Sequence, residues 1–288
     1  MTAEPPMPAG TSLDAIQRII DADVTYTVSR MQVLERLPGN PIGIAYRAVE
    51  PGITALMARH LPSPSFNRVV GRRAGDERHI APLVAWYRDH GVAGRFEMVP
   101  SHFDAALGRE LARLGYYHSG FHAYHSGFHA ALICGADAPV APAGGVAIEA
   151  VTSASLMEDF LQAYVAGWGF AEKDHAHFKA NVRPWLGQSG WSLYLARVGD
   201  RPAAAATLYV HDKTAYLADA ATDPAFRGRG LHTALLTRRI ADARHAGADL
   251  IFSGAEFLSG SYRNMERIGM RLAFMRAIWT PLPADAPR

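Results

Sequence analysis

The sequence is poor in several features, and each shortage excludes a class of protein. Cys134 is the only cysteine among 288 residues, so no internal disulfide can form and a reducing compartment fits. No apolar run approaches the roughly 20 residues that a membrane-spanning helix needs. Residues 1–10 contain prolines and Glu4, but not the basic and apolar segments of a secretory signal. We therefore expect a cytoplasmic protein without a membrane partner.

An excess of charge of one sign is also missing. The 29 Lys and Arg residues against 27 Asp and Glu residues leave a formal net charge of +2, and the arginines are scattered along the chain. A nucleic-acid partner is not expected, because binding DNA or RNA requires a concentrated basic surface. Hydrophobic residues make up 49% of the chain, enough for buried cores, and the length favours two domains.

One stretch combines turn residues with positive charge: residues 223–232, Asp-Pro-Ala-Phe-Arg-Gly-Arg-Gly-Leu-His. A strand pattern of small residues precedes it, and a helical pattern follows it. This order directs free backbone N–H groups and the positive end of a helix at an anion. Gly228 and Gly230 remove side chains where a ligand must come close, and Arg227 and Arg229 add charge. The stretch predicts a phosphate or pyrophosphate site.

The spacing Arg227-x-x-Gly230-x-His232, after a strand and Asp-Pro, resembles the R/Q-x-x-G-x-G/A loop of GNAT acetyltransferases. In that family the loop holds the pyrophosphate of acetyl-CoA. His232 departs from the pattern, because Gly or Ala is usual there. Since backbone donors need no particular side chain, we expect His232 to point outward while its N–H still donates.

The resemblance implies acetyl-CoA as co-substrate and no metal. It also implies a set of cofactor-binding residues on the loop, on the strand before it and on a later helix. These are Ala220, Ala221, Thr222, Arg227, Gly228, Arg229, Gly230, Leu231, His232, Thr233, Ser261 and Asn264.

The order of the patterned segments extends the resemblance. From residue 146 the chain predicts a strand, two helices, three strands, the loop with its helix, a strand, a helix and a closing strand region over 270–280. Residues 42–135 follow this order more loosely, and their segment 69–75 lacks the loop spacing. The resemblance implies an α/β (α+β) fold with two GNAT-like domains. Each has a mixed, mostly antiparallel sheet flanked by helices, and the second has splayed central strands over 215–222 and 249–253.

Composition predicts where these domains meet. Residues 137–145 are rich in Pro, Gly and Ala, as is typical of a linker. We expect a degenerate, non-binding N-terminal domain over 1–136, which starts with two helices over 16–20 and 24–37, and a catalytic domain over 146–288. An unrelated α/β domain is the alternative for the first half.

A tandem repeat lies before this linker. Residues 117–123, Tyr-His-Ser-Gly-Phe-His-Ala, are followed at once by an identical copy, 124–130. Because the repeat is odd in length and strand facing alternates every two residues, the second copy would face the other way. We expect one copy to form a bulge, a loop or an overlong edge. The histidines suggest a metal, but their spacing follows from the duplication, and Gly120 and Gly127 disfavour a helix.

Transfer of an acetyl group to an amine needs a base that removes the amine proton. Glu256 follows the strand pattern 249–253 and is the favoured candidate. Asp219 lies on the facing strand, where a strand-end salt bridge is its plainer role. His175 and His177 lie in the segment that, in the family, usually forms the acceptor wall.

Many GNAT members have a tyrosine four residues before the glycine equivalent to Gly269, where it protonates the departing thiolate. Here that residue is Met265, and Tyr262, one turn earlier, either replaces it or is buried in the core. Ser261 suits a cofactor contact and equally a helix N-cap. Four aromatic residues suit an acceptor pocket or the core: Trp168, Phe170, Trp185 and Trp191.

We therefore expect an N-acetyltransferase that moves the acetyl group of acetyl-CoA to a primary amine of a small-molecule acceptor, with a homodimer left open. The alternative is a catalytically weak acyl-CoA-binding regulator or pseudo-enzyme, which Met265 and His232 favour. A nucleotide-binding module unrelated to CoA is the third interpretation.

Overall fold

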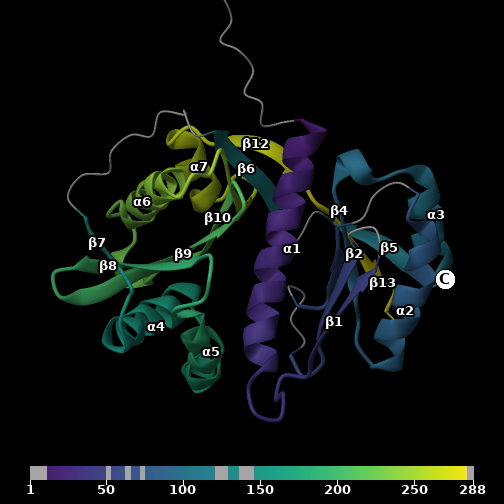
Figure 1. Ribbon diagram of the computed structural model, residues 1–288, viewed down its shortest axis with the longest axis horizontal. Helices are drawn as coiled ribbons and strands as arrows, with labels where there is room; N and C mark the ends of the chain where they lie inside the picture. The colour runs from purple at the N-terminus through teal and green to yellow at the C-terminus, as the bar shows by residue number, and fades with distance from the viewer. Residues whose placement is uncertain are drawn as a thin grey trace, which may run out of the picture. The chain divides into compact units, whose positions relative to one another are not determined.

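The computed structural model describes residues 12–49, 53–61, 66–71, 75–120, 129–135 and 146–283. Its contacts divide the chain into two compact units, each assembled from separated segments of the sequence (Figure 1). Unit 1 comprises Met1–Ala22 and Leu132–Ala273, and unit 2 comprises Asp23–Ala131 and Phe274–Arg288. The predicted linker 137–145 and residues 121–128 of the tandem repeat lie outside the described residues.

Unit 2 contains a six-stranded sheet with the order β1-β2-β3-β4-β13-β5. Strands β3 and β4 are parallel, and the other neighbours pair antiparallel. The strands are β1 (Ile44–Val49), β2 (Ile53–Ala58), β3 (Arg68–Val70), β4 (Arg95–Met98), β5 (Tyr116–Gly120) and β13 (Ala277–Pro281). The helices are α2 (Ile80–Asp89), α3 (Ala105–Arg113) and, from Asp23 onward, α1 (Leu13–Glu35).

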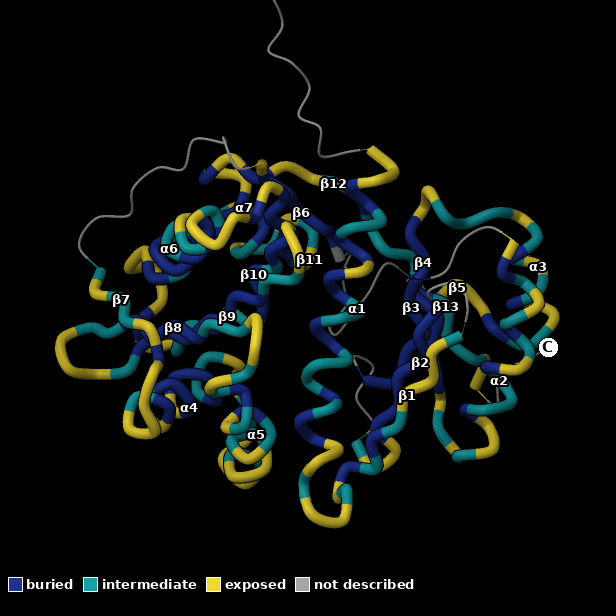
Figure 2. Tube along the Cα trace, viewed as in Figure 1, coloured by how far each residue is buried: buried dark blue, intermediate teal, exposed yellow. Residues whose placement is uncertain are grey.

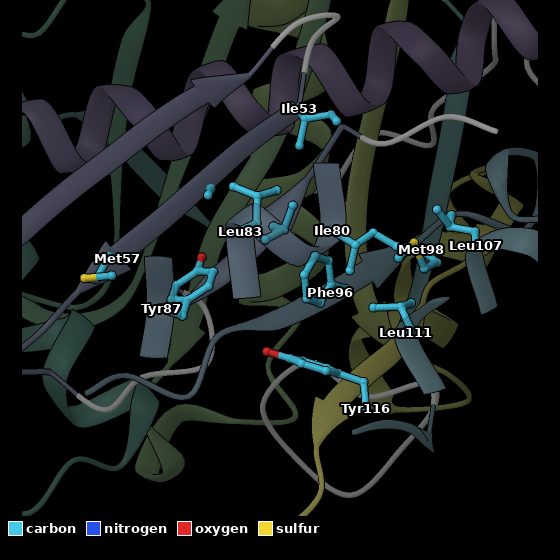
Figure 3. Packing of buried hydrophobic residues seen from close by; sticks show 12 residues of the cluster. Ile53, Met57, Ile80, Leu83, Tyr87, Phe96, Met98, Leu107, Leu111 and Tyr116 are labelled. Atoms are coloured by element: carbon cyan, nitrogen blue, oxygen red, sulfur yellow. The ribbon is translucent and has the colours of Figure 1, made fainter. Parts of the chain in front are cut away.

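Side-chain alternation gives this sheet a separate core on each face. Within β2, Ile53 and Met57 belong to the cluster formed with α2 and α3, whereas Leu56 and Ala58 belong to the cluster formed with α1. All residues of β2 are buried, as expected for a strand covered on both faces. Figure 2 shows the central strands as the most buried part of the unit, and Figure 3 shows the α2 and α3 cluster from close by.

The α1 face of the same sheet also carries a group of buried charges. Glu97 of β4 accepts from Arg68 at 2.7 Å and from Arg95 at 2.6 Å. Arg276 donates to Asp23 of α1 at 2.7 Å. Burial alone would raise the pKa of both carboxyl groups, but the neighbouring guanidinium groups hold each pKa below its ordinary value. The attraction between these opposite charges therefore offsets the free-energy cost of removing each of them from water.

Unit 1 contains a seven-stranded sheet with the order β12-β6-β11-β10-β9-β8-β7, in which β10 and β11 are parallel. The strands are β6 (His129–Gly135), β7 (Ala147–Ala150), β8 (Trp191–Val198), β9 (Arg201–His211), β10 (Thr214–Thr222), β11 (Leu250–Glu256) and β12 (Arg271–Met275). The helices are α4 (Ala154–Trp168), α5 (His175–Val182), α6 (Leu231–His245) and α7 (Gly260–Arg267).

Helices cover both faces of this sheet as well. Leu193 and Leu195 of β8 lie in the cluster formed with α4 and α5. Tyr194, between them, points to the opposite face and donates to Asp242 of α6 at 2.8 Å. The order of elements from β7 to β12 is the predicted one, and the two mixed, mostly antiparallel sheets confirm the predicted fold class.

Two predictions about the elements are wrong. The two helices expected over 16–20 and 24–37 are one helix, α1, because residues 13–35 contain no glycine or proline that would interrupt it. The closing region 270–280 is two strands, and only β12 stays in the sheet of unit 1, whereas β13 joins the sheet of unit 2. A strand pattern in the sequence does not specify which sheet receives the strand.

Among the described helices, none is both long and apolar enough to cross a membrane. In the same part of the chain, no three His, Cys, Asp or Glu side chains come together as a metal ion would require.

Candidate functional site

Strands β10 and β11 pair over only part of their length. Their parallel register runs from Thr214 opposite Leu250 to Leu217 opposite Ser253, although both strands continue further. At this last rung the hydroxyl of Ser253 donates to the carbonyl of Leu217 at 2.7 Å. Among the described residues, no pair of β10 and β11 follows this rung. The sheet therefore opens between the two strands towards the end of β10 at Thr222.

A β-bulge lies at the same point on the other side of β10. Ala218 lies opposite Thr207 of β9, but the next pair is Ala221 with Ala205, so two residues of β10 face a single residue of β9. One of the two, Asp219, has a φ of +45°, a value that residues other than glycine seldom adopt. Because strand facing has a period of two, the extra residue reverses the faces of the residues that follow.

A glycine-containing loop connects β10 to α6. Asp223 accepts from the backbone N–H of Ala225 at 2.9 Å and so starts the short 3₁₀ turn Pro224–Phe226. Gly228 and Gly230 then both adopt a φ of +76°, which glycine allows without steric cost. Gly230 is the N-cap of α6, and no side chain caps the helix there. The N–H groups of the first turn therefore remain available to a ligand.

A cavity of about 730 Å³ joins these features, and all its lining residues belong to unit 1. It is bounded by the loop, the first turn of α6, the end of β10, the last residues of α4 and one side of α7 from its first residue to its last. Every predicted cofactor-binding residue except Arg229 lines it. The guanidinium of Arg229 instead lies over the ring of Phe226, 5.7 Å from its centroid.

The sequence interpretation missed several lining residues: Gly167, Phe226, Gly260 and Arg267. Gly167 had a detectable signal, because a glycine inside a helical pattern often marks a close approach. A Cβ atom at this position would lie 2.8 Å from backbone atoms of Ala221 and Thr222. Helix α4 thus touches the backbone of β10 where the strand lines the cavity. For Arg267 no local signal distinguishes it from the other arginines of the chain.

The side chain of His232 lies between α6 and α7, not outward as expected. Its Nδ1 is 3.2 Å from the amide nitrogen of Asn264, and its Nε2 is 3.3 Å from the hydroxyl of Ser261. Burial, with a smaller contribution from the charge of Arg239, lowers the pKa of His232 to about 4. The neutral ring therefore accepts from Asn264 at Nδ1 and donates to Ser261 from Nε2. Both partners also line the cavity.

Comparison with known proteins identifies this arrangement. Residues 137–262 match the family model for the acetyltransferase (GNAT) domain. Over these residues the chain has a GNAT acetyltransferase domain. The matched residues run from the predicted linker into α7, so they include the opening between β10 and β11, the bulge and the loop. No curated protein matches the sequence.

Solved structures share the GNAT fold over most of the chain. A GCN5-related N-acetyltransferase from Kribbella flavida has a TM-score of 0.63 at 16% identity, covering 92% of this chain and 96% of its own. A functionally unknown conserved protein from Staphylococcus epidermidis ATCC 12228 has a TM-score of 0.59 at 14% identity, with coverages of 83% and 94%. A tandem GNAT protein from the clavulanic acid biosynthesis pathway has a TM-score of 0.57 at 14% identity, with coverages of 92% and 98%.

The candidate catalytic residues of the GNAT domain lie outside the lining of the cavity. Glu256 is exposed and is the last residue of β11, whereas the sequence pattern ended this strand before it. Asp219 is half-buried in the bulge, 3.4 Å from the hydroxyl of Thr207. Tyr262 is buried, with its ring 5.1 Å from that of Phe257, and burial and a neighbouring carboxylate raise its pKa. Asp219 and Tyr262 nevertheless each adjoin a lining residue in the sequence.

The remaining candidates separate into core and surface positions. Trp168 is 42% exposed and lines the cavity, whereas Trp185 is buried against Trp191, with ring centroids 5.2 Å apart. His175 contacts the carbonyl of Phe170 at 2.9 Å, and His177 lies 3.2 Å from the amide of Asn181. Neither histidine lines the cavity.

The N-cap of α7 also differs from the expectation. Ser259, not Ser261, caps this helix, accepting from the N–H of Tyr262 at 3.1 Å. The hydroxyl of Ser261 is therefore engaged with His232 at the cavity.

Proposed function

We propose that this GNAT domain binds acetyl-CoA in the cavity and transfers the acetyl group to a primary amine of a small-molecule acceptor. The observation that carries the proposal is the uncapped N-terminus of α6, opened by Gly228 and Gly230, at a cavity that extends along the unpaired end of β10. Such a terminus offers backbone donors and a positive dipole end to a pyrophosphate.

The chemistry of the lining supports this ligand. Arg227 and Arg267 add positive charge, and no carboxylate is among the described lining residues to repel phosphates. Beyond the loop, Ala220, Ala221 and Thr222 line the cavity with small side chains. Their backbone can pair with the pantetheine amides, as a neighbouring strand would, while the loop and first helical turn hold the pyrophosphate.

The proposed reaction needs one proton to be removed. The neutral amine attacks the thioester carbonyl carbon, the carbon–sulfur bond breaks, and the nitrogen loses its proton to a base. We assign this base to Glu256, with Asp219 as the competing candidate. The CoA thiolate is a good leaving group, because a thiol has a pKa near 8.5. The rate of acetyl transfer should therefore depend little on a tyrosine acid, which Met265 replaces here.

The cofactor part of the proposal is tested by calorimetric titration with CoA. We expect about one CoA per chain, since segment 69–75 lacks the loop spacing in the sequence. We expect Gly230→Glu to abolish binding by adding bulk and negative charge at the phosphates. Gly247→Glu is the matched control, because Gly247 also has a positive φ, is exposed and lies outside the cavity lining. Two sites per chain, or unchanged binding in Gly230→Glu, would contradict the proposal.

One observation favours a second function, that of an acyl-CoA-binding regulator. None of the candidate catalytic residues lines the cavity, and Met265 replaces the usual tyrosine. Thiol release from acetyl-CoA over a panel of amines separates the two functions: turnover supports the enzyme, and tight CoA binding without turnover supports the regulator. Competition of ATP against CoA in a thermal-shift assay tests the third interpretation, a nucleotide site. A cytoplasmic location and a homodimer stay expectations.

A further inference from the structure

Arg239 is a fully buried arginine on the inner face of α6. Its Nη1 donates both to the carbonyl of Thr207 at 2.8 Å and to that of Ala218 at 3.0 Å. Its Nε donates to the carbonyl of Leu235, one turn earlier in the helix, at 3.0 Å. Burial lowers the pKa of the guanidinium to about 10, so it stays charged at neutral pH. The guanidinium thus links α6 to both β9 and β10.

The two strand carbonyls bound by Arg239 belong to the last regular pair before the bulge, Ala218 and Thr207. A bulge locally disrupts the ladder, and a buried carbonyl without a partner is unfavourable. The guanidinium supplies that partner to both strands from a single nitrogen. The charge of Asp219, in the bulge itself, further favours the charged guanidinium.

Leu217 precedes Ala218 in β10, and its carbonyl points to the opposite edge of the strand. There it accepts a hydrogen bond from the hydroxyl of Ser253. Successive carbonyls of a strand point to opposite edges. Arg239 therefore binds the edge of β10 that faces β9, and Ser253 binds the edge that faces β11, at the point where regular pairing of β10 ends. Everything that β10 contributes to the cavity, Ala220 to Thr222, follows directly after this point. If β10 lost the bulge, these residues would shift by one position and exchange faces.

We propose that Arg239 is a positioning residue for acyl transfer, which maintains the bulge and thereby the course of Ala220–Thr222 along the cavity. The inference rests on the proposed function, in which the pantetheine lies against this segment. Arg239 is not among the lining residues, so it acts through the strand and not by touching the cofactor.

The test compares Arg239→Met and Arg239→Lys with Arg238→Met. Arg238 is the matched control, because it lies on the same helix, pairs with Asp242 and does not bond to the bulge. Calorimetry is done with acetyl-CoA and with adenosine 3′-phosphate 5′-diphosphate, the nucleotide half of CoA. Hydrogen exchange is followed by mass spectrometry in peptides covering 203–222, with residues 191–198 of β8 as internal reference.

In Arg239→Met we expect acetyl-CoA affinity to fall about tenfold or more, while affinity for the nucleotide half stays within about twofold. Exchange over 203–222 should rise at least about tenfold relative to β8. Arg239→Lys should fall between this variant and wild type, because a lysine keeps the charge but not the planar fork. Arg238→Met should behave as wild type.

Equal loss of affinity for both ligands would mean a general effect on the fold and would overturn the inference, as would unchanged exchange over 203–222. If Arg239→Met does not fold, Arg239→Lys decides: wild-type acetyl-CoA affinity in that variant overturns the inference, and a selective loss supports it. Absence of CoA binding in the wild-type protein would instead refute the proposed function, and the inference with it.

Discussion

Glu256 and Asp219 have different surroundings, and these decide which is the better general base. Glu256 is exposed at the end of β11, whereas Asp219 is half-buried beside the charge of Arg239. An exposed side chain at a strand end is free to approach an acceptor, whereas Asp219 is held in the bulge, 3.4 Å from the hydroxyl of Thr207. We therefore expect Glu256→Gln to lower turnover about 10²–10⁴-fold, measured by thiol release, and to leave acetyl-CoA affinity nearly unchanged.

Glu158→Gln is the control for this prediction, because Glu158 is exposed, pairs with Arg183 and lies outside the cavity lining. Normal turnover in Glu256→Gln together with an inactive Asp219→Asn would reverse the assignment. Normal turnover in both would mean that the acceptor binds already deprotonated. Met265→Tyr should give no large gain, since protonation of the thiolate does not limit the rate near neutral pH.

His232 makes the contact between α6 and α7 sensitive to acid. Its pKa falls from an ordinary value near 6.5 to about 4, so the unfolded chain takes up a proton before the folded one does. The stability contributed by the neutral ring is complete above about pH 6.5 and is lost as the pH falls towards 4. Urea unfolding of wild type and His232→Ala should therefore show a smaller difference at pH 4.5 than at pH 7.5.

His245→Ala provides the comparison for His232, because His245 is exposed in the last turn of α6. This variant controls for the loss of a histidine from α6 at a position that does not contact α7 through Ser261 or Asn264. A pH-independent difference for His232→Ala would show that the ring is not held neutral between the two helices.

At the scale of elements, the contact of α4 with β10 shapes one wall of the cavity. A side chain at Gly167 would press on the backbone of Ala221 and Thr222, and backbone cannot move aside as a flexible side chain does. Overpacking of this kind typically costs about 1–3 kcal/mol. We expect Gly167→Ala to destabilise the protein by that amount in urea unfolding and to weaken CoA binding in calorimetry.

Gly135→Ala is the control for the helix contact. Gly135 also lacks a positive φ, but a Cβ atom there would meet nothing within 4 Å. This variant should keep wild-type stability within about 0.5 kcal/mol, as is usual for exposed positions. Unchanged CoA affinity in a folded Gly167→Ala protein would show that the wall tolerates displacement.

The parallel strand pairs β10–β11 and β3–β4 differ in what surrounds them. Between β10 and β11 the pairing ends early, and the strand beyond it lines a cavity. Between β3 and β4, Arg68 lies opposite Arg95, and both reach Glu97 on the face that α1 covers. The helix and the buried charges occupy this face of unit 2, and a single CoA site per chain stays a prediction.

At the scale of the whole molecule, the last strand of the sequence completes the sheet of the first half. Arg276 lies between β12 and β13, and its guanidinium reaches Asp23 at 2.7 Å and Glu97 at 3.2 Å. Removing one partner from a buried ionic group typically costs about 3–5 kcal/mol, because it leaves uncompensated charge. We expect Arg276→Met to lose stability of this order in urea unfolding followed by circular dichroism at neutral pH.

Arg271→Met is the control, since Arg271 is exposed on the neighbouring strand β12. The contribution of the carboxylates has its own pH dependence: with each pKa held below its ordinary value, it is present above about pH 4 and is lost as the pH falls further. A loss in Arg276→Met no larger than in Arg271→Met would show that the group does not anchor β13.

Local signals in the sequence were enough to predict much of the fold and the glycine-containing loop between β10 and α6. The order of elements from residue 146 follows from apolar periodicity and from turn residues, which act between near neighbours. Gly228 and Gly230 are informative for the same reason, because their positive φ angles are properties of single residues. Ser261 and Asn264 were found only through the family resemblance, and the structure brings them to the cavity through His232.

The sequence alone therefore determined the order of elements from residue 146 and the two glycines that shape the loop, and the family resemblance added the fold class. Only the tertiary structure decided which sheet receives β6 and β13, where Glu256 and Tyr262 lie relative to the cavity, and that Arg239 supports the bulge of β10. These outcomes depend on strand pairing and burial between residues far apart in the chain. Such contacts form only when the sheets assemble, and no local pattern encodes them.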